Sequence, residues 1–379
     1  MTYEKDVIKG KRIYFLDNLR TFMIFLVVVV HAGLIYEKSG FAASWWIVYD
    51  PSNSDLPGLL FFSLDIFIMS TIFFISGFFT PLSVKNKNSW VFIKSKFKRL
   101  IIPWIFAVLT LVPLYKIIFL YSRNLPQHNW TSYFHWSNGI WSQNWLWFLP
   151  VLFLFDILYL LLSKVKTKTA NLNLLISVIS IFLIGVTYSF SFDIFKWQGW
   201  TKTIFIDFQN ERLLIYFMLF LLGSLCYRLK IFETKSPGKK LYLALNSTVW
   251  IPIILYLVFF LYPLLKPGNY IFSENVDTLV KWINFHLSLL SMLYILINTF
   301  RYYFYKHGKI SEDLKNNSYN VYIIHIVVMG GIALTMLNTE IHAMLKYLIL
   351  IISSFIVSNL LVSFYRRAIK SKFLPKERK

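Results

Sequence analysis

Ten mostly apolar stretches alternate along the chain with short polar segments. A helix of roughly twenty apolar residues crosses the hydrocarbon core of a bilayer, and backbone polar groups in lipid must find partners within their own segment. Each stretch is therefore predicted to be a transmembrane α-helix. The predicted spans are residues 14–36, 58–80, 100–121, 145–163, 172–190, 213–229, 245–265, 282–300, 319–338 and 345–366. The pattern predicts an all-α, polytopic membrane helix bundle, with a single domain over residues 1–379.

Lysine and arginine are spread unevenly over the segments that connect these spans. Of 39 such residues, 27 lie in the N-terminal tail and in every second segment after it, 7 lie in the intervening segments and 5 lie within spans. Cytoplasmic connections carry the excess of positive charge, so both termini are predicted to be cytoplasmic. The chain is therefore expected to be a multi-pass protein of the bacterial inner (plasma) membrane.

Composition supports the membrane class. Hydrophobic residues make up 57% of the chain and charged residues only 15%, whereas soluble domains carry about 25% charged residues. The formal charge of +21 follows from the positive-inside bias and favours contact with anionic membrane lipid. Because the basic residues are scattered over short loops, nucleic acid is not expected as a partner. The sequence gives no indication of oligomeric state.

The first predicted span contains three titratable residues, Asp17, Arg20 and His31. Eleven residues separate Arg20 from His31, which in an α-helix gives about 20° of net rotation and a rise of roughly 16 Å. These two side chains therefore share one face at two depths, and Asp17 lies one turn before Arg20. Titratable residues inside a membrane usually mark a function, although Arg20 can also snorkel to the interface and His31 can be a purely structural hydrogen-bonding group.

Other spans supply possible partners at those depths. Asp65 enters from the outer side and is expected level with His31, whereas Asn320 and His325 enter from the cytoplasmic side and are expected level with Arg20. A basic run precedes the third span and contains Lys96, Lys98 and Arg99. Interhelical hydrogen bonding alone would also explain buried polar residues of this kind. The histidines lack ligand spacing such as HExxH, so no metal site is predicted.

Several motifs together resemble the acyltransferase family 3 membrane proteins. The first helix of that family typically contains an arginine, ten intervening residues and a histidine. Arg20 and His31 reproduce this spacing in residues 12–36, RIYFLDNLRTFMIFLVVVVHAGLIY. The segments FFISGFFTP, KFKRLIIPW, LWFLPVLFLFDILY and SYNVYIIH follow in the expected order. LDNLRTF and ISGFFTP are most similar to the glucan biosynthesis protein C group, whose members are thought to succinylate periplasmic glucans. One departure is Lys96, three residues before Arg99, where many relatives have arginine; lysine keeps the charge but loses the bidentate fork.

The resemblance implies transfer of an acetyl or succinyl group from cytoplasmic acyl-CoA to a hydroxyl of an extracytoplasmic polysaccharide or glycolipid. In this reaction acyl-CoA is a co-substrate and not a tightly bound cofactor. Asp17, Arg20, Lys96, Lys98, Arg99, Asn320 and His325 are then candidates for binding the CoA end. His31 is the candidate general base, oriented by Asp65, because histidine changes protonation near neutral pH. An acyl-histidine intermediate is the variant mechanism.

A proton-coupled secondary transporter or a flippase for lipid-linked glycans is the alternative function. Such proteins usually have repeated halves and spans broken by Gly or Pro near the midplane, and no repeated halves are apparent in this chain. Several tryptophans in an outer segment, Trp130, Trp136, Trp141 and Trp145, are candidates for a glycan platform. The interfacial aromatic belt that membrane proteins generally have is the favoured interpretation of most of them.

Overall fold

The structure is a computed structural model that describes residues 13–85, 87–134, 143–164, 173–233, 238–306 and 308–373. Trp136, Trp141 and the two chain ends lie outside these residues. Within the described part of the chain, nine helical segments are long and apolar enough to cross a membrane. Leu213–Arg228, where the sixth span is predicted, is apolar but shorter. The predicted all-α polytopic bundle is confirmed.

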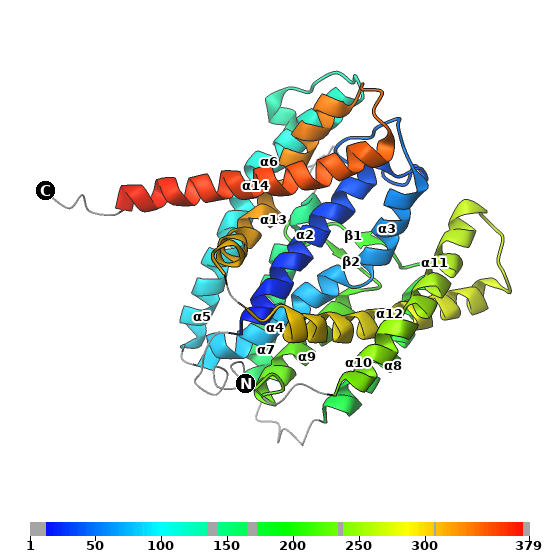
Figure 1. Cartoon of the computed structure of the whole chain (residues 1–379), viewed down its shortest axis with the longest axis vertical. Helices are drawn as coiled ribbons and strands as arrows, with labels where there is room; N and C mark the ends of the chain where they lie inside the picture. The colour runs from blue at the N-terminus through cyan, green and yellow to red at the C-terminus, as the bar shows by residue number, and fades with distance from the viewer. Residues whose placement is uncertain are drawn as a thin grey trace, which may run out of the picture. The chain divides into compact units, whose positions relative to one another are not determined.

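The long helices coincide with the predicted apolar stretches, and the order of the elements can be followed in Figure 1. The α-helices are α2 (Tyr14–Tyr36), α3 (Asp55–Asp65), α4 (Ile68–Lys85), α5 (Ser89–Lys96), α6 (Ile102–Ser122), α7 (Phe148–Lys164), α8 (Leu174–Ile194), α9 (Leu213–Arg228), α10 (Lys239–Thr248), α11 (Trp250–Leu265), α12 (Glu274–Tyr303), α13 (Lys309–Met336) and α14 (Ala343–Phe373). Shorter helical turns are η1 (Phe97–Ile101), η2 (Trp130–Phe134) and η4 (Asn144–Trp147). Strands β1 (Trp200–Thr201) and β2 (Phe208–Gln209) form a small antiparallel pair in which Trp200 faces Gln209.

Two helices begin well before the apolar stretch that predicted them. α12 begins at Glu274 because the Ser273 side chain caps it by accepting a hydrogen bond from the Val276 N–H, 3.4 Å away. α13 begins at Lys309, ten residues before the predicted start of the span, because its polar first turns remain helical. Hydropathy finds the part of a helix that lies in lipid, and polar turns outside lipid extend the helix without changing that signal.

The second predicted span is broken in the middle. α3 ends at Asp65 and α4 begins at Ile68, so a helix break follows directly after a carboxylate. A break frees backbone carbonyl groups, which need partners when they are buried. The Arg212 guanidinium Nη1 supplies one, at 3.4 Å from the Asp65 carbonyl oxygen and 2.6 Å from its Oδ2.

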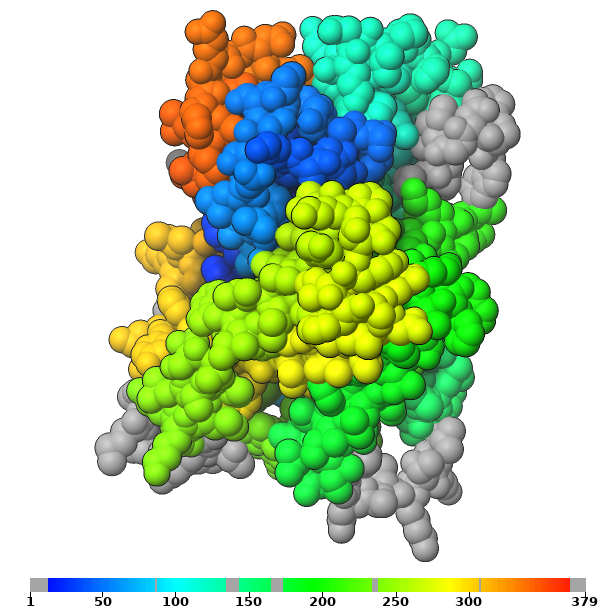
Figure 2. All heavy atoms as spheres, turned by 90° about the vertical axis from the view of Figure 1, so that its right-hand side faces the viewer, coloured from blue at the N-terminus to red at the C-terminus, as the bar shows by residue number. Residues whose placement is uncertain are grey.

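The chain divides into two compact units. The first contains residues 1–19, 62–112 and 134–305, and the second contains residues 20–61, 113–133 and 306–379. In the first unit α11 packs along α12, seen as the neighbouring yellow-green and yellow surfaces in Figure 2. α4 and α9 pack against each other backbone to backbone at Gly77 and Gly223. A Cβ atom added to Gly77 would lie 1.9 Å from the Phe220 carbonyl oxygen, so no side chain fits there.

In the second unit α13 and α14 lie side by side (Figure 1). The part of α2 that belongs to this unit contacts α14 at two points. The Tyr347 hydroxyl donates to the Val29 carbonyl oxygen at 3.2 Å, and Phe25 meets Phe355 edge to face. These contacts set the position of α2 within the unit that contains His31.

Candidate functional site

α2 is one uninterrupted helix that carries Asp17, Arg20 and His31. Because Arg20 and His31 are eleven residues apart on this helix, they lie on nearly the same face, about 16 Å apart along the axis. Asp17 is buried, whereas Arg20 and His31 are partly exposed. The helix thus presents a guanidinium and an imidazole at two levels of one face.

His31 pairs with a second histidine. Its Nδ1 lies 2.8 Å from Nε2 of His325 on α13, and the two ring planes are nearly parallel, with an interplanar angle of 14°. The sequence-based expectation placed His325 near Arg20 and is corrected here. His325 lies more than four turns after the start of α13 at Lys309, and its Nε2 contacts His31.

The hydrogen bonds of His325 determine which nitrogen of His31 is basic. His325 Nδ1 lies 2.7 Å from the carbonyl oxygen of Tyr322 and 3.2 Å from that of Val321. Carbonyl oxygens only accept, so Nδ1 is the protonated nitrogen and Nε2 of neutral His325 carries the lone pair. That lone pair accepts from His31 Nδ1–H. The remaining lone pair of neutral His31 is therefore on Nε2, for which the described residues provide no hydrogen bond.

An indole covers one side of the His31 ring. Trp46 lies with its ring centroid 5.0 Å from that of His31, and its Nε1–H donates to the His31 carbonyl oxygen at 3.1 Å. Tyr115 meets the same indole edge to face. The imidazole is thus held between an apolar aromatic ring and a neutral histidine, neither of which adds charge.

Asp65, expected as the group that orients His31, forms an ion pair with Arg212, 2.6 Å from Oδ2 to Nη1. The guanidinium also lies over the ring of Phe285 at 4.7 Å. Asp65 and His31 belong to different units, so the expected role of Asp65 in orienting His31 stays a prediction, and the partner of His31 within its own unit is His325. The helix break after Asp65 leaves its carboxylate and its carbonyl as joint acceptors for Arg212.

The three basic residues before α6 have different surroundings. Lys96 Nζ lies 2.8 Å from Oδ1 of the fully buried Asp156, which also accepts from the Thr80 hydroxyl at 3.0 Å. Lys98 and Arg99 are exposed and lie in η1, a π-helical turn. Such turns are frequent at functional sites. Lys96 therefore neutralises a buried carboxylate, whereas Lys98 and Arg99 face outward.

Asn320 is half-buried on α13, five residues before His325. Five residues correspond to about 140° of rotation, so the two side chains lie on different faces of the helix. Sequence reasoning treated them as one group at one depth, and helix geometry separates them. It also missed Trp46, because an indole in an outer connection has the same composition signal as the interfacial belt.

A comparison with protein-family models matches residues 13–363 to the acyltransferase family 3 model, described as an acyltransferase domain. No curated protein and no solved structure matches the chain at the level required for a confident relationship. The family match covers nearly all of the described residues, including Arg20, His31 and His325. The chain belongs to acyltransferase family 3 and is a multi-pass membrane acyltransferase.

Proposed function

We propose that this acyltransferase moves an acetyl or succinyl group from cytoplasmic acyl-CoA to a hydroxyl of an extracytoplasmic glycan, with His31 as general base. The observation that carries the proposal is the paired histidines. Because His325 receives the Nδ1 proton of His31, the Nε2 lone pair is available to accept a proton from an incoming hydroxyl.

In the proposed reaction, His31 Nε2 removes the acceptor's hydroxyl proton as the oxygen attacks the thioester carbonyl carbon. An ester C–O bond forms and the C–S bond breaks. The proton on His31 then passes to the departing CoA thiolate, which returns the imidazole to its neutral form. As His31 becomes positively charged, its Nδ1–H bond to His325 strengthens, because a hydrogen bond from an ionised donor is stronger than a neutral one.

Basic residues of each unit are proposed separately as partners of the CoA phosphates. Lys98 and Arg99 are exposed on η1 and have the charge that CoA phosphates require. Arg20 is a third candidate, since it lies about three turns of α2 from His31 and an extended pantetheine arm is of similar length. Lys96 is bound to Asp156 and is a weaker phosphate candidate than the sequence indicated.

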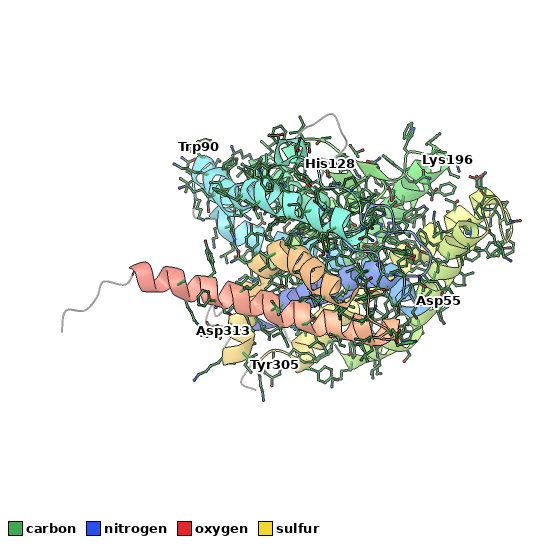
Figure 3. The ribbon with its side chains drawn as sticks, turned by 90° about the horizontal axis from the view of Figure 1, so that it is seen from above. Asp55, Trp90, His128, Lys196, Tyr305 and Asp313 are labelled. Carbon is green, nitrogen blue, oxygen red and sulfur yellow. The ribbon has the colours of Figure 1, made fainter. Side chains whose placement is uncertain are left out.

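The test compares His31→Ala with His128→Ala in proteoliposomes loaded with radiolabelled acetyl- or succinyl-CoA. His128 is an exposed histidine at the periphery (Figure 3) and provides the matched control. We expect His31→Ala to lower transfer to envelope glycans by about 10²- to 10⁴-fold, the usual contribution of a general base. The same variant is expected to keep its thermal stabilisation by acyl-CoA.

Mass spectrometry of O-acyl groups on envelope glycans from wild-type, deletion and His31→Ala strains identifies the acyl group and the acceptor. Transfer by His31→Ala at the wild-type rate would refute the role of His31. Absence of any stabilisation by acetyl- or succinyl-CoA in the wild-type protein would refute the donor.

A further inference from the structure

Two aromatic side chains are exposed on the segment that follows α2. Phe41 and Trp45 have 43% and 42% of their surface exposed, and their rings meet edge to face with centroids 5.6 Å apart. The Trp45 Nε1–H donates to the Phe41 carbonyl oxygen at 2.8 Å, which fixes the indole relative to the turn. The pair is therefore a small aromatic surface of defined orientation.

Side chains hold the backbone of this surface from two directions. The Glu37 carboxylate accepts from the Ala42 N–H at 2.9 Å and from the Ser39 hydroxyl, which closes the turn before the aromatic pair. The Tyr115 hydroxyl donates to the Trp45 carbonyl oxygen at 2.5 Å. Polar groups thus fix the turn at both ends of the exposed pair.

Arg123 adds two further bonds from its Nη2, to the carbonyl oxygens of Ala43 at 2.7 Å and Trp46 at 3.0 Å. Burial lowers the pKa of Arg123 from its ordinary value, but a guanidinium stays protonated in proteins. The backbone on both sides of Trp45 is thus bound by a permanent cation.

A buried ion pair anchors the far part of the segment. Lys346 of α14 lies 2.9 Å from Oδ2 of Asp50, and each side chain is 1% exposed. The other oxygen of Asp50 accepts from the Ser52 N–H at 2.9 Å. A pair of this kind is costly to break, since removing one partner leaves an uncompensated buried charge. The segment is therefore fixed on α14 as well as on α6.

Ring contacts connect the exposed pair to the proposed base. Trp45 meets Trp46 edge to face at 5.4 Å, and Trp46 lies 5.0 Å from His31. Trp46 is almost fully buried, so the series runs from an exposed indole through a buried one to the imidazole. The exposed surface is two ring contacts from the nitrogen that is proposed to act on the acceptor.

We propose that Phe41 and Trp45 form a binding subsite for a sugar ring of the acceptor glycan, an assignment that rests on the proposed function. The C–H bonds on the flat face of a pyranose ring are apolar and slightly positive, and they match the negative face of the indole. Stacking on Trp45 would hold one residue of the glycan while a hydroxyl of the same or the next residue reaches His31.

Groups for the sugar hydroxyls are present on the same segment. Lys38 and Asp55 form an exposed ion pair with a separation of 3.5 Å, and Asp55 lies at the surface in Figure 3. The bridge between Glu37 and Ser54 brings the two ends of the segment together and so places this pair beside the turn. An apolar face with adjacent charged donors and acceptors is the usual composition of a site for a small polar ligand.

The turn that carries this pair is held by side chains before any ligand binds. Here Glu37, Tyr115 and Arg123 fix the turn that carries the rings. Orientation before binding lowers the entropy cost of holding a ligand.

The test measures the KM for an oligosaccharide of the acceptor glycan, as identified by the mass spectrometry described above, with Trp45→Leu and Phe41→Leu. Trp197→Ala, which removes another exposed indole, is the matched control. We expect Trp45→Leu to raise this KM about 3- to 10-fold, the effect of one aromatic stacking contact. The kcat and the KM for acyl-CoA are expected to stay within twofold of wild type, and Trp197→Ala to behave as wild type.

Binding of the same oligosaccharide to His31→Ala protein, followed by isothermal titration calorimetry, separates this inference from the proposed reaction. Loss of that binding in the double variant with Trp45→Leu supports the subsite whether or not His31 is the base. An unchanged oligosaccharide KM and unchanged binding for both Trp45→Leu and Phe41→Leu, with His31→Ala inactive, would overturn the subsite alone and leave these residues as interfacial aromatics.

Discussion

His325 can be tested as a positioning residue by two substitutions that differ in one property. His325→Leu fills similar volume but removes the acceptor for His31 Nδ1–H. His325→Gln supplies a side-chain carbonyl oxygen at about the reach of the imidazole Nε2, so it can accept the same hydrogen bond. The original bond is 2.8 Å long and joins two side chains fixed on different helices. Comparing the two substitutions therefore isolates the contribution of the hydrogen-bond acceptor.

The magnitude follows from the change in charge during the reaction. In the proposed reaction the bond joins neutral groups in the resting state, and His31 becomes cationic in the transition state. A hydrogen bond to a charged group contributes about 1.5–3 kcal/mol, and each 1.36 kcal/mol changes a rate tenfold. We therefore expect His325→Leu to lower kcat by roughly 10- to 150-fold, with His325→Gln recovering most of that loss.

Single-turnover transfer from labelled acyl-CoA to glycan is the appropriate assay, because product release does not enter it. The KM for acyl-CoA should change little in either variant, since His325 is assigned to the base and not to the CoA end. Equal rates for His325→Leu and wild type, with both proteins folded, would refute the assignment. Equal and severe losses for Leu and Gln would show that the imidazole itself is required and that an acceptor alone is insufficient.

Two further predictions concern the packing and the buried charges of the first unit. Gly77→Ala is expected to prevent formation of a monodisperse, folded protein in detergent, because its Cβ would lie 1.9 Å from the backbone oxygen of Phe220. Gly331→Ala is the control and should be stable, because no atom lies within 4 Å of the added Cβ. Equal melting temperatures of the two variants would contradict this prediction. Lys96→Met is expected to destabilise the protein by about 3–5 kcal/mol in denaturant unfolding, because it leaves the buried Asp156 carboxylate unpaired. The double variant with Asp156→Asn should recover much of that loss, and a double variant as unstable as the single one would refute the electrostatic explanation.

The sequence predicted the helices because hydrophobic length is a local property. α2 has the predicted bounds, and every other predicted span overlaps a helix. The break after Asp65 was not predictable from hydropathy, since Ile66 and Phe67 are as apolar as a continuous helix would require. That break depends on Arg212, which reaches Asp65 from 147 positions away in the sequence. A local pattern contains no information about such a partner.

The candidate site was predictable residue by residue but not in its pairings. Matching depths from predicted ends placed Asp65 with His31 and His325 with Arg20, and the expectation for His325 is corrected by its contact with His31. Which side chains of two helices meet depends on the tilt and packing of both helices, and hydropathy contains no information about either.

The partner of His31 has a consequence for its chemistry that a carboxylate partner would not have. A carboxylate beside an imidazole favours the cationic ring in the resting state, and a cationic ring has no lone pair with which to accept a proton. His325 holds the ring through Nε2 and is itself oriented by the Tyr322 carbonyl, so it directs the His31 lone pair without adding charge. Asp65, whose charge is compensated by Arg212, is then an element of the helix break. In the reaction proposed above, a histidine partner would orient the base without adding a charge to its surroundings.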